Sequence, residues 1–403
     1  MDLKGGTPYW FVLHGLRTVV PPLDRDVRCD VAVIGSGITG ALVAERLTRD
    51  GAVVAMVDSR DVAQGSTMAS TALLQYDLDV PLHKLERSLG TTTAGQAFQL
   101  GVEAINRLEA ISGRVGGNFA RSPSLYVLRD SDELPELEAE FRSRRLAGLD
   151  VEWLDREALL ARWQVHACAG IQSAVGATVD PYDLTHRLLG EVIRRGGLVY
   201  DRTRVVSMRA HAAGVELQTD RGAVVRADHV VNACGYEAAS DLDPRMIQLV
   251  STFALISEPV DTLPASSDCL LWEYADPYLY ARWTDRRLLV GGEDVDFTDA
   301  AARDRLIPTK VQALIDKYRL FDPSVRIEPA FAWAGTFATT ADGLGFIGPV
   351  PGNPRVLYAL GFGGNGITFS MLAADMLADT IAGVRVPELE LFRLDRSAQE
   401  VSP

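Results

Sequence analysis

Two short apolar runs near the N-terminus flank a helix-like segment. CDVAVIG, at residues 29–35, is an apolar run that ends in glycine, and VVAMVD occupies Val53–Asp58. Each run predicts a buried parallel strand. Between them Ile38–Arg49 is rich in helix formers and stops before Gly51. A strand, a helix and a strand within about thirty residues predict a right-handed βαβ unit.

The remaining patterns predict further layers. Residues 91–162 read as helical and charged without glycine-rich turns, which predicts an inserted segment on the substrate side. Asp180–Arg195 predicts a helix opened by Asp-Pro. Longer aromatic strands at 246–292 predict an antiparallel sheet with one face over a pocket, and 301–318 is compatible with a helix. The first 28 residues are irregular and predict an arm packed on the domain.

Composition narrows the class of protein. The chain has 403 residues, enough for two domains or one large domain with an insertion. A hydrophobic content of 47% is that of a globular protein, and the net charge of −14 argues against nucleic acid or an anionic membrane as the main partner. We expect no signal peptide and no membrane span.

Cysteine and histidine spacing predicts no metal site. Four cysteines, Cys29, Cys168, Cys234 and Cys269, lie far apart without a CxxC pair, and the six histidines show no partner spacing. Free thiols fit a reducing compartment, so we expect a cytoplasmic protein.

A G-x-G-x-x-G motif stands between the first predicted strand and helix. It consists of Gly35, Ser36, Gly37, Ile38, Thr39 and Gly40. The first glycine permits a tight turn, the second a close approach to a pyrophosphate, and the third close packing of helix and strand. Asp58 ends the next strand, where a carboxylate binds an adenosine ribose and repels the 2′-phosphate of NADP. The motif favours a dinucleotide site over a structural turn and leaves FAD and NAD open.

Five motifs in order, DVAVIGSGITG, GSTMAST, ADHVVNACGY, WAGTFATTADGLGFIG and GFGGNGITFS, span nearly the whole chain. Their combination resembles the D-amino-acid oxidase/glycine oxidase/sarcosine oxidase superfamily of FAD enzymes. The resemblance implies an α/β (α+β) fold: a Rossmann-like FAD-binding domain and an antiparallel-sheet substrate domain, both discontinuous. It assigns 29–90, 165–245 and 330–390 to the FAD-binding domain, 91–164 and 246–329 to the substrate domain, and 1–28 to the arm.

The resemblance also implies which residues hold FAD. The glycine motif would bind the pyrophosphate and Asp58 the ribose, while the backbone of Val205 meets the adenine unless this valine is only a core residue. The last glycine-rich loop would bring bare N–H groups to the pyrimidine edge of the flavin, with a helix beginning near Ile367. The further positions are Ser59, Arg60, Gly65, Ser66, Thr67, Ser70, Thr71, Ala72, Leu73, Ala233, Cys234, Gly235, Gly335, Gly363, Gly364, Asn365, Gly366 and Thr368. We expect non-covalent FAD, because the cysteine and histidine that tether flavin in some relatives are missing.

The chemistry that the resemblance implies is oxidation of a C–N bond. A C–H bond beside an amine nitrogen gives hydride to flavin N5, and the imine hydrolyses. Three positions where relatives bind a substrate carboxylate with a cation are neutral here: Gln75, Phe337 and Thr368. Thr336, beside Phe337, is a candidate catalytic residue, as is Gln75.

Strand alternation predicts that Tyr278, Tyr280 and Arg282 share a face, and Tyr280 and Arg282 are candidate catalytic residues. Arg282 is otherwise a surface residue on a sheet edge. Asp77, Asp79 and Glu293 either attract a cationic amine or cap loops and face water. Leu289 aligns with the lysine that activates oxygen in sarcosine oxidases, so oxygen and another electron acceptor both stay open.

The sequence therefore predicts an FAD-dependent oxidase or dehydrogenase of an amine or amino-acid-derived substrate, of unknown oligomeric state. Two alternatives remain: a hydroxylase that uses FAD and NAD(P)H, and a flavoprotein subunit of a multi-component dehydrogenase.

Overall fold

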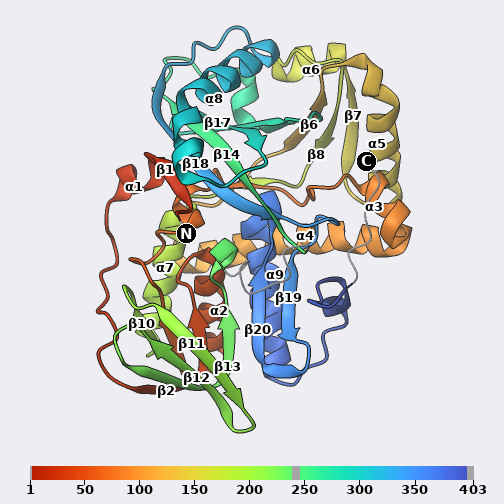
Figure 1. Ribbon diagram of the computed structural model, residues 1–403. Helices are drawn as coiled ribbons and strands as arrows, with labels where there is room; N and C mark the ends of the chain where they lie inside the picture. The colour runs from red at the N-terminus through yellow and green to blue at the C-terminus, as the bar shows by residue number, and fades with distance from the viewer. Residues whose placement is uncertain (1, 238–245, 397–403) are drawn as a thin grey trace.

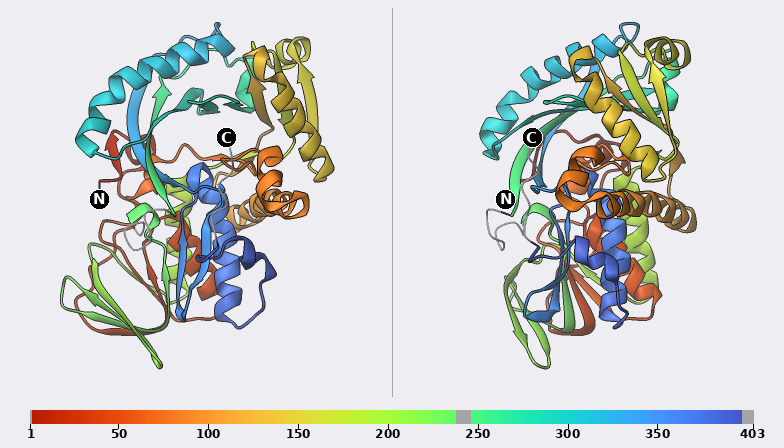
Figure 2. Two further views of the ribbon diagram at one scale, coloured as in Figure 1. Left: turned by 45° about the vertical axis from the view of Figure 1, so that its right-hand side comes forward. Right: turned by 90° about the vertical axis from the view of Figure 1, so that its right-hand side faces the viewer.

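The computed structural model describes residues 2–237 and 246–396. The domain boundary expected at residue 245 and the first residue of the expected arm lie outside these ranges. Figures 1 and 2 show two layered units, a lower one built on a mostly parallel sheet and an upper one built on a wide, mostly antiparallel sheet. The long helix α4 (Thr91–Val115) runs between them. The predicted α/β fold, with a Rossmann-like unit and an antiparallel sheet, is confirmed.

The lower sheet has the strand order β10-β3-β2-β13-β12-β11, and β19 and β20 join it through β13. Strands β10, β3, β2, β13 and β20 run parallel, whereas β11, β12 and β19 are antiparallel to their neighbours. The bounds are β2 Val27–Ile34, β3 Val54–Val57, β10 Leu198–Tyr200, β11 Val205–His211, β12 Gly214–Thr219, β13 Val224–Asn232, β19 Phe346–Val350 and β20 Asn353–Leu360. Between β2 and β3 lies α2 (Ile38–Arg49), so the predicted βαβ unit is present.

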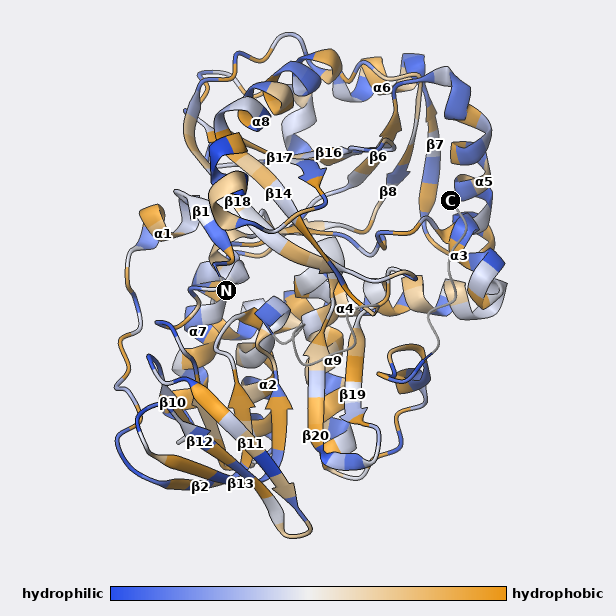
Figure 3. Cartoon of the chain, in the orientation of Figure 1, coloured by the Kyte–Doolittle hydropathy of each residue, from blue (hydrophilic) through white to orange (hydrophobic). Residues whose placement is uncertain are grey.

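Three helices cover one face of this sheet: α2, α7 (Pro181–Arg194) and α9 (Gly366–Ile381). Leu42, Leu188 and Leu377 are fully buried among them. The apolar residues of the lower strands appear orange in Figure 3, notably in β20 and beside α2. Because parallel strands are covered on both faces, they are apolar throughout rather than alternating.

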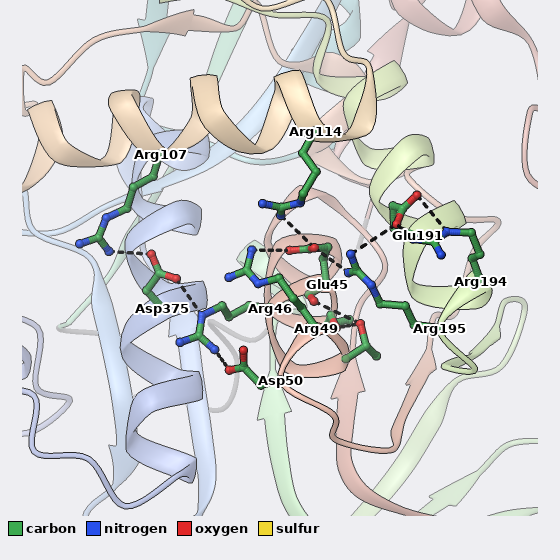
Figure 4. A network of polar contacts seen from close by, with 12 residues as sticks. Glu45, Arg46, Arg49, Asp50, Arg107, Arg114, Glu191, Arg194, Arg195 and Asp375 are labelled. Carbon is green, nitrogen blue, oxygen red and sulfur yellow. Dashed lines mark hydrogen bonds and ion pairs between the residues drawn. The ribbon is translucent and has the colours of Figure 1, made fainter.

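A buried carboxylate ties these helices together (Figure 4). Glu45 of α2 is fully buried, and Arg114 of α4 and Arg195 after α7 donate to it at 2.9 and 2.7 Å. Asp375 of α9 accepts from Arg46 at 3.2 Å and from Arg107 of α4 at 2.6 Å. A buried charge is tolerated when it is paired in this way. The network therefore fixes α4 against the helices of the lower unit.

The upper sheet has nine strands in the order β1-β18-β14-β17-β16-β15-β6-β8-β7. Its bounds are β1 Lys4–Gly6, β6 Ser124–Leu128, β7 Val151–Asp155, β8 Ala169–Ser173, β14 Gln248–Ser257, β15 Leu270–Glu273, β16 Leu279–Thr284, β17 Arg287–Val295 and β18 Pro329–Thr339. Helix α8 (Ala300–Phe321) contacts β14, β16, β17 and β18 on the outer face. A small sheet joins β4 (Leu73–Leu74), β9 (Ala177–Thr178) and β5 (Ala120–Arg121).

Several local expectations differ from the structure. Residues 91–162 are not helical throughout: β6 and β7 interrupt α4, α5 (Leu134–Leu146) and α6 (Arg156–Trp163). Both strands are five residues long, too short for their alternation to stand out beside charged helices. The expected irregular arm contains β1, which pairs with β18, and α1 (Tyr9–His14). Strands β8 and β18 pair within the upper sheet, although the expected boundaries place both in the FAD-binding domain.

Candidate active site

A cavity of about 1160 Å³ extends from the lower sheet to the inner face of the upper sheet. Its walls come from the turn between β2 and α2, the segment 65–84, the turn after β13, the inner face of β14 to β18, and the loop before α9. Pockets for drug-sized ligands measure roughly 300–1,000 Å³. This cavity is large enough for an extended cofactor and a substrate together.

The turn between β2 and α2 forms one end of the cavity. Gly35 has φ +104°, and a Cβ there would lie 2.5 Å from the carbonyl oxygen of Ala233. A Cβ on Gly40 would lie 1.9 Å from the carbonyl oxygen of Gly35. Both glycines therefore permit backbone contacts that no other residue allows. Helix α2 begins at Ile38 after its N-cap Gly37, and its N-terminus lines the cavity, where helix N–H groups bind anions.

Asp58 lies beside this turn and lines the cavity. Its Oδ2 accepts hydrogen bonds from the N–H and the Oγ of Ser36, both at 2.7 Å, and its Oδ1 accepts from the N–H of Arg60 at 2.9 Å. Burial raises the pKa of the Asp58 carboxyl against these hydrogen bonds. Asp58 thus holds the glycine turn in shape, and each oxygen keeps lone-pair capacity for a ribose hydroxyl.

The segment that follows Gly65 is anchored by three donors from distant elements. The carbonyl oxygen of Ala69 accepts from the indole of Trp333 at 2.8 Å, and that of Ser70 from the indole of Trp10 at 2.7 Å. The carbonyl oxygen of Ala72 accepts from Arg282 at 3.1 Å. Three anchored carbonyls fix the backbone of a segment that lines the cavity from Gly65 to Leu73.

The loop before α9 closes the cavity at the other end. Gly363 has φ +56°, and a Cβ there would lie 1.9 Å from a carboxylate oxygen of Asp79. The N–H of Gly364 donates to both oxygens of Asp79 at 3.2 Å. Asp79 is exposed to the cavity, and desolvation there raises the pKa of its carboxyl to about 6.

Aromatic side chains form the wall that faces this loop. Trp272 pairs with Tyr280 on one neighbouring strand and with Tyr126 on the other, so the three rings share a face. The rings of Tyr126 and Trp272 stack with centroids 3.6 Å apart. Burial raises the pKa of the Tyr280 hydroxyl to about 12, so this group acts as a neutral hydrogen-bond partner at pH 7. The aromatic wall, defined as Tyr126, Trp272, Tyr274, Tyr278 and Tyr280, lines the cavity.

A β-bulge decides which carboxylate of β17 faces the cavity. Gly292 and Glu293 have φ +128° and +59°, and the N–H of Glu293 donates to the carbonyl of Tyr278 at 3.2 Å. Glu293 consequently points to α8, where Lys310 donates to it at 3.1 Å and Lys317 also pairs with it. Asp294 then faces the cavity.

Asp294 was missed at the sequence level. Thr252 and Tyr278 lie beside its carboxyl group, and its Oδ1 is buried. Burial raises the pKa of this carboxyl. The two glycines that precede Glu293 were the available signal, because glycine within a strand often marks a bulge.

Arg282 does not line the cavity. It is 2% exposed, its guanidinium donates to the carbonyls of Ala72 and Val179 at 3.1 and 3.2 Å, and it lies 5.3 Å from the ring centroid of Trp10. Burial lowers the pKa of Arg282 to about 10, against the effect of nearby carboxylates. The interpretation as a surface arginine is wrong, and its position fits a residue that positions the cavity wall.

Asp77 also lies away from the cavity and is buried. It pairs with Arg144 at 2.5 Å, and Arg144 donates to Glu140 at 2.7 Å. Glu140 in turn contacts His83 at 2.8 Å. This buried network supports the segment on which Gln75 and Asp79 lie.

Most residues predicted to contact cofactor or substrate line the one cavity. Exceptions are Ser36, Gly40, Arg282, Asp77 and Glu293. Among the predicted substrate-side residues, Gln75, Tyr280 and Thr336 line it. Thr336 Oγ1 accepts from Arg303 at 3.1 Å, which leaves its hydroxyl proton for donation, and the Gln75 amide donates to Ser124 at 2.7 Å. On the cofactor side the lining residues are Gly35, Gly37, Ile38, Thr39, Asp58, Ser59, Arg60, Gly65, Ser66, Thr67, Ser70, Thr71, Ala72, Leu73, Val205, Ala233, Cys234, Gly235, Gly335, Gly363, Gly364, Asn365, Gly366, Ile367 and Thr368.

The chain matches the family model described as FAD dependent oxidoreductase over residues 30–380. The chain belongs to this family. The predicted superfamily and the FAD cofactor are confirmed. The glycine turn, Asp58 and the bare loop before α9 fit this cofactor, because glycine backbone lines the cavity at two separate places, where the pyrophosphate and the flavin ring of FAD would be held.

Relatives of the FAD-dependent oxidoreductase chain align over nearly its whole length. Glycine oxidase of Bacillus licheniformis is 26% identical over 92% of this chain and 98% of its own. Gamma-glutamylputrescine oxidoreductase of Escherichia coli (strain K12) is 24% identical over 90% of this chain and 85% of its own. The crystal structure of glycine oxidase from Geobacillus kaustophilus superposes with a TM-score of 0.78 at 21% identity, covering 92% of this chain and 99% of that one.

The cysteines and the helices of the described chain test two further expectations. Within residues 2–237 and 246–396, Cys29, Cys168, Cys234 and Cys269 form no disulfide with one another. In the described part of the chain, no helix combines the length and the apolar character that crossing a bilayer requires.

Proposed function

We propose that this FAD-dependent oxidoreductase oxidises a C–N bond of an amine or amino-acid-derived substrate. The observation that carries the proposal is the continuity of the cavity from the glycine turn to the aromatic wall. A substrate against this wall lies in the same enclosed space as a cofactor held by the two glycine loops. Bound FAD supplies the acceptor for a hydride from the carbon beside the nitrogen, and water then hydrolyses the imine.

The residues of the chain orient the substrate and exclude water. Tyr280 offers its hydroxyl group to the cavity, and Gln75 is held between Ser124 and the Thr368 hydroxyl, which donates to the Gln75 carbonyl at 3.2 Å. The Thr336 hydroxyl accepts from Arg303 of α8 instead. At the loop before α9 the helix N-terminus stabilises negative charge on a reduced cofactor. The names of the two relatives, a glycine oxidase and a gamma-glutamylputrescine oxidoreductase, support C–N chemistry.

The test is anaerobic mixing of the purified holoenzyme with amines and with D-, L- and N-methyl amino acids. We expect at least one of them to bleach the absorbance of the oxidised flavin at about 450 nm. Bleaching by NADH alone would instead identify the hydroxylase alternative. Failure of every amine and amino acid to reduce the flavin would contradict the proposal. The rate at which oxygen restores the absorbance then distinguishes an oxidase from a dehydrogenase with another acceptor.

A further inference from the structure

We propose that the substrate is an alkylammonium whose oxidised carbon carries no carboxylate, and that the aromatic wall and Asp294 bind its charged nitrogen. This inference rests on the proposed C–N oxidation and names the substrate class of that site. Four observations carry it: the aromatic wall, the carboxylate selected by the bulge, the excess of acidic residues, and the hydrogen bonds and ion pairs that already hold Arg144, Arg282 and Arg303 to other protein groups.

The aromatic wall offers π faces to a cation. Tyr126 and Trp272 stack on each other, Tyr274 meets Tyr126 edge-on with centroids 5.4 Å apart, and Tyr278 lies 5.9 Å from Tyr280. Ring faces attract ammonium groups most strongly where water is excluded, as in aromatic cages for methylated amines. Tyr126 stacks on Trp272, and the guanidinium of Arg144 lies 5.1 Å from the centroid of its ring. The other four rings of the wall are therefore the ones that suit the alkyl chain and the charge of an amine.

Asp294 adds a negative charge beside these rings. The bulge at Gly292 and Glu293 directs Asp294 into the cavity, and Thr252 and Tyr278 lie beside its carboxyl group. Its Oδ1 is buried. The negative charge of this carboxylate at the cavity wall would attract a bound ammonium group.

The substrate end of the cavity is acidic overall. Among the described lining residues at this end, the acidic ones are Asp79, Glu133, Glu273, Asp276, Asp294 and Asp296, and the basic one is Lys84. Arg60 and Arg204 lie at the opposite end with Asp58 and Val205. A carboxylate of the substrate would therefore join an existing excess of negative charge, whereas an ammonium group would reduce it.

The arginines closest to this end are already engaged. Arg282 donates to the carbonyls of Ala72 and Val179, and Arg144 pairs with Asp77 and Glu140. Arg303, which is fully buried, donates to Thr336, to the carbonyl of Asp2 and to Asp304. A substrate carboxylate would thus be buried without a bidentate partner, which selects against it.

The test compares matched probes by calorimetric titration of the wild-type holoenzyme. The probes are n-butylamine, 1,4-diaminobutane, and D- and L-2-aminopentanoate, which adds one carboxylate to the butylamine skeleton. We expect the two amines to bind at least about tenfold more tightly than either amino acid. Equal or tighter binding of the amino acids would overturn the inference. This comparison needs no variant.

Two variants locate the effect. Asp294→Asn should weaken amine binding by about tenfold or more. Glu293→Gln is the matched control, because this neighbouring carboxylate points to Lys310 and Lys317 on the other face of the sheet. We expect it to bind amines as the wild type does. Loss of amine binding in both variants, or in neither, would contradict the role of Asp294.

Flavin reduction separates this inference from the proposed function. Anaerobic bleaching by the amines and not by the amino acids supports both proposals. Bleaching by the amino acids alone supports C–N oxidation and overturns the alkylammonium class. If no probe bleaches the flavin, C–N oxidation fails, and the calorimetric comparison still decides whether the cavity selects cations.

Discussion

Gly35→Ala tests whether the turn between β2 and α2 depends on backbone contact. Gly35 has φ +104°, and an added Cβ would lie 2.5 Å from the oxygen and 2.9 Å from the carbon of the Ala233 carbonyl. A left-handed conformation costs an L-residue about 1–2 kcal/mol. Overpacking against backbone adds about 1–3 kcal/mol, because this carbonyl cannot rotate away as a side chain would. We expect a total loss of about 2–5 kcal/mol in unfolding free energy.

Gly51→Ala is the matched control. Gly51 has a similar φ of +96°, but nothing lies within 4 Å of its added Cβ. This variant should lose only the conformational part, about 1–2 kcal/mol. Urea unfolding of the two apo-proteins measures the difference, and titration with FAD measures its consequence for cofactor affinity. Gly35→Ala should weaken FAD binding at least about tenfold and Gly51→Ala should not. Equal destabilisation by both variants would refute the argument from close contact.

Three further predictions concern the supports of the cavity. Arg282→Met should lower the unfolding free energy by about 2–6 kcal/mol and weaken FAD binding, because it leaves the buried carbonyls of Ala72 and Val179 without donors; unchanged urea midpoints would contradict this. Burial raises the pKa of Glu140, but Arg144 and a histidine outweigh it and bring that pKa from 4.5 to about 2. The resulting stabilisation is complete above pH 4.5 and lost toward pH 2, so the stability difference between wild type and Glu140→Gln should shrink over that range in fluorescence-monitored unfolding. Finally, trichloroacetic acid should release the yellow colour from the protein, and colour in the washed pellet would show covalent FAD.

Much of the cofactor site could be predicted from the sequence because its signals are local. Gly35, Gly37 and Gly40 carry their meaning in their spacing, and the apolar runs around them predict the strand and helix that they join. Helix α2 has the predicted bounds Ile38–Arg49. The glycines before α9 could also be predicted, because several glycines close together leave the backbone without side chains whatever the tertiary structure around them.

The substrate side was predicted less well because long-range contacts determine it. Arg282 shares a strand face with Tyr280, as alternation predicts, yet its guanidinium reaches the carbonyls of Ala72 and Val179, more than a hundred residues away in the chain. Strand alternation says which face a side chain occupies and nothing about what covers that face.

The sequence by itself determined the βαβ unit, the two glycine loops and the family, because turn geometry and apolar periodicity depend on neighbouring residues. Only the tertiary structure decided which charges meet the substrate. Glu293 and Asp294 are adjacent and chemically alike, but a bulge of one residue turns the first to the lysines of α8 and the second to the cavity. The position of a bulge depends on how the strand pairs with its neighbours. The environment of each carboxylate depends on the elements that pack against its face of the sheet.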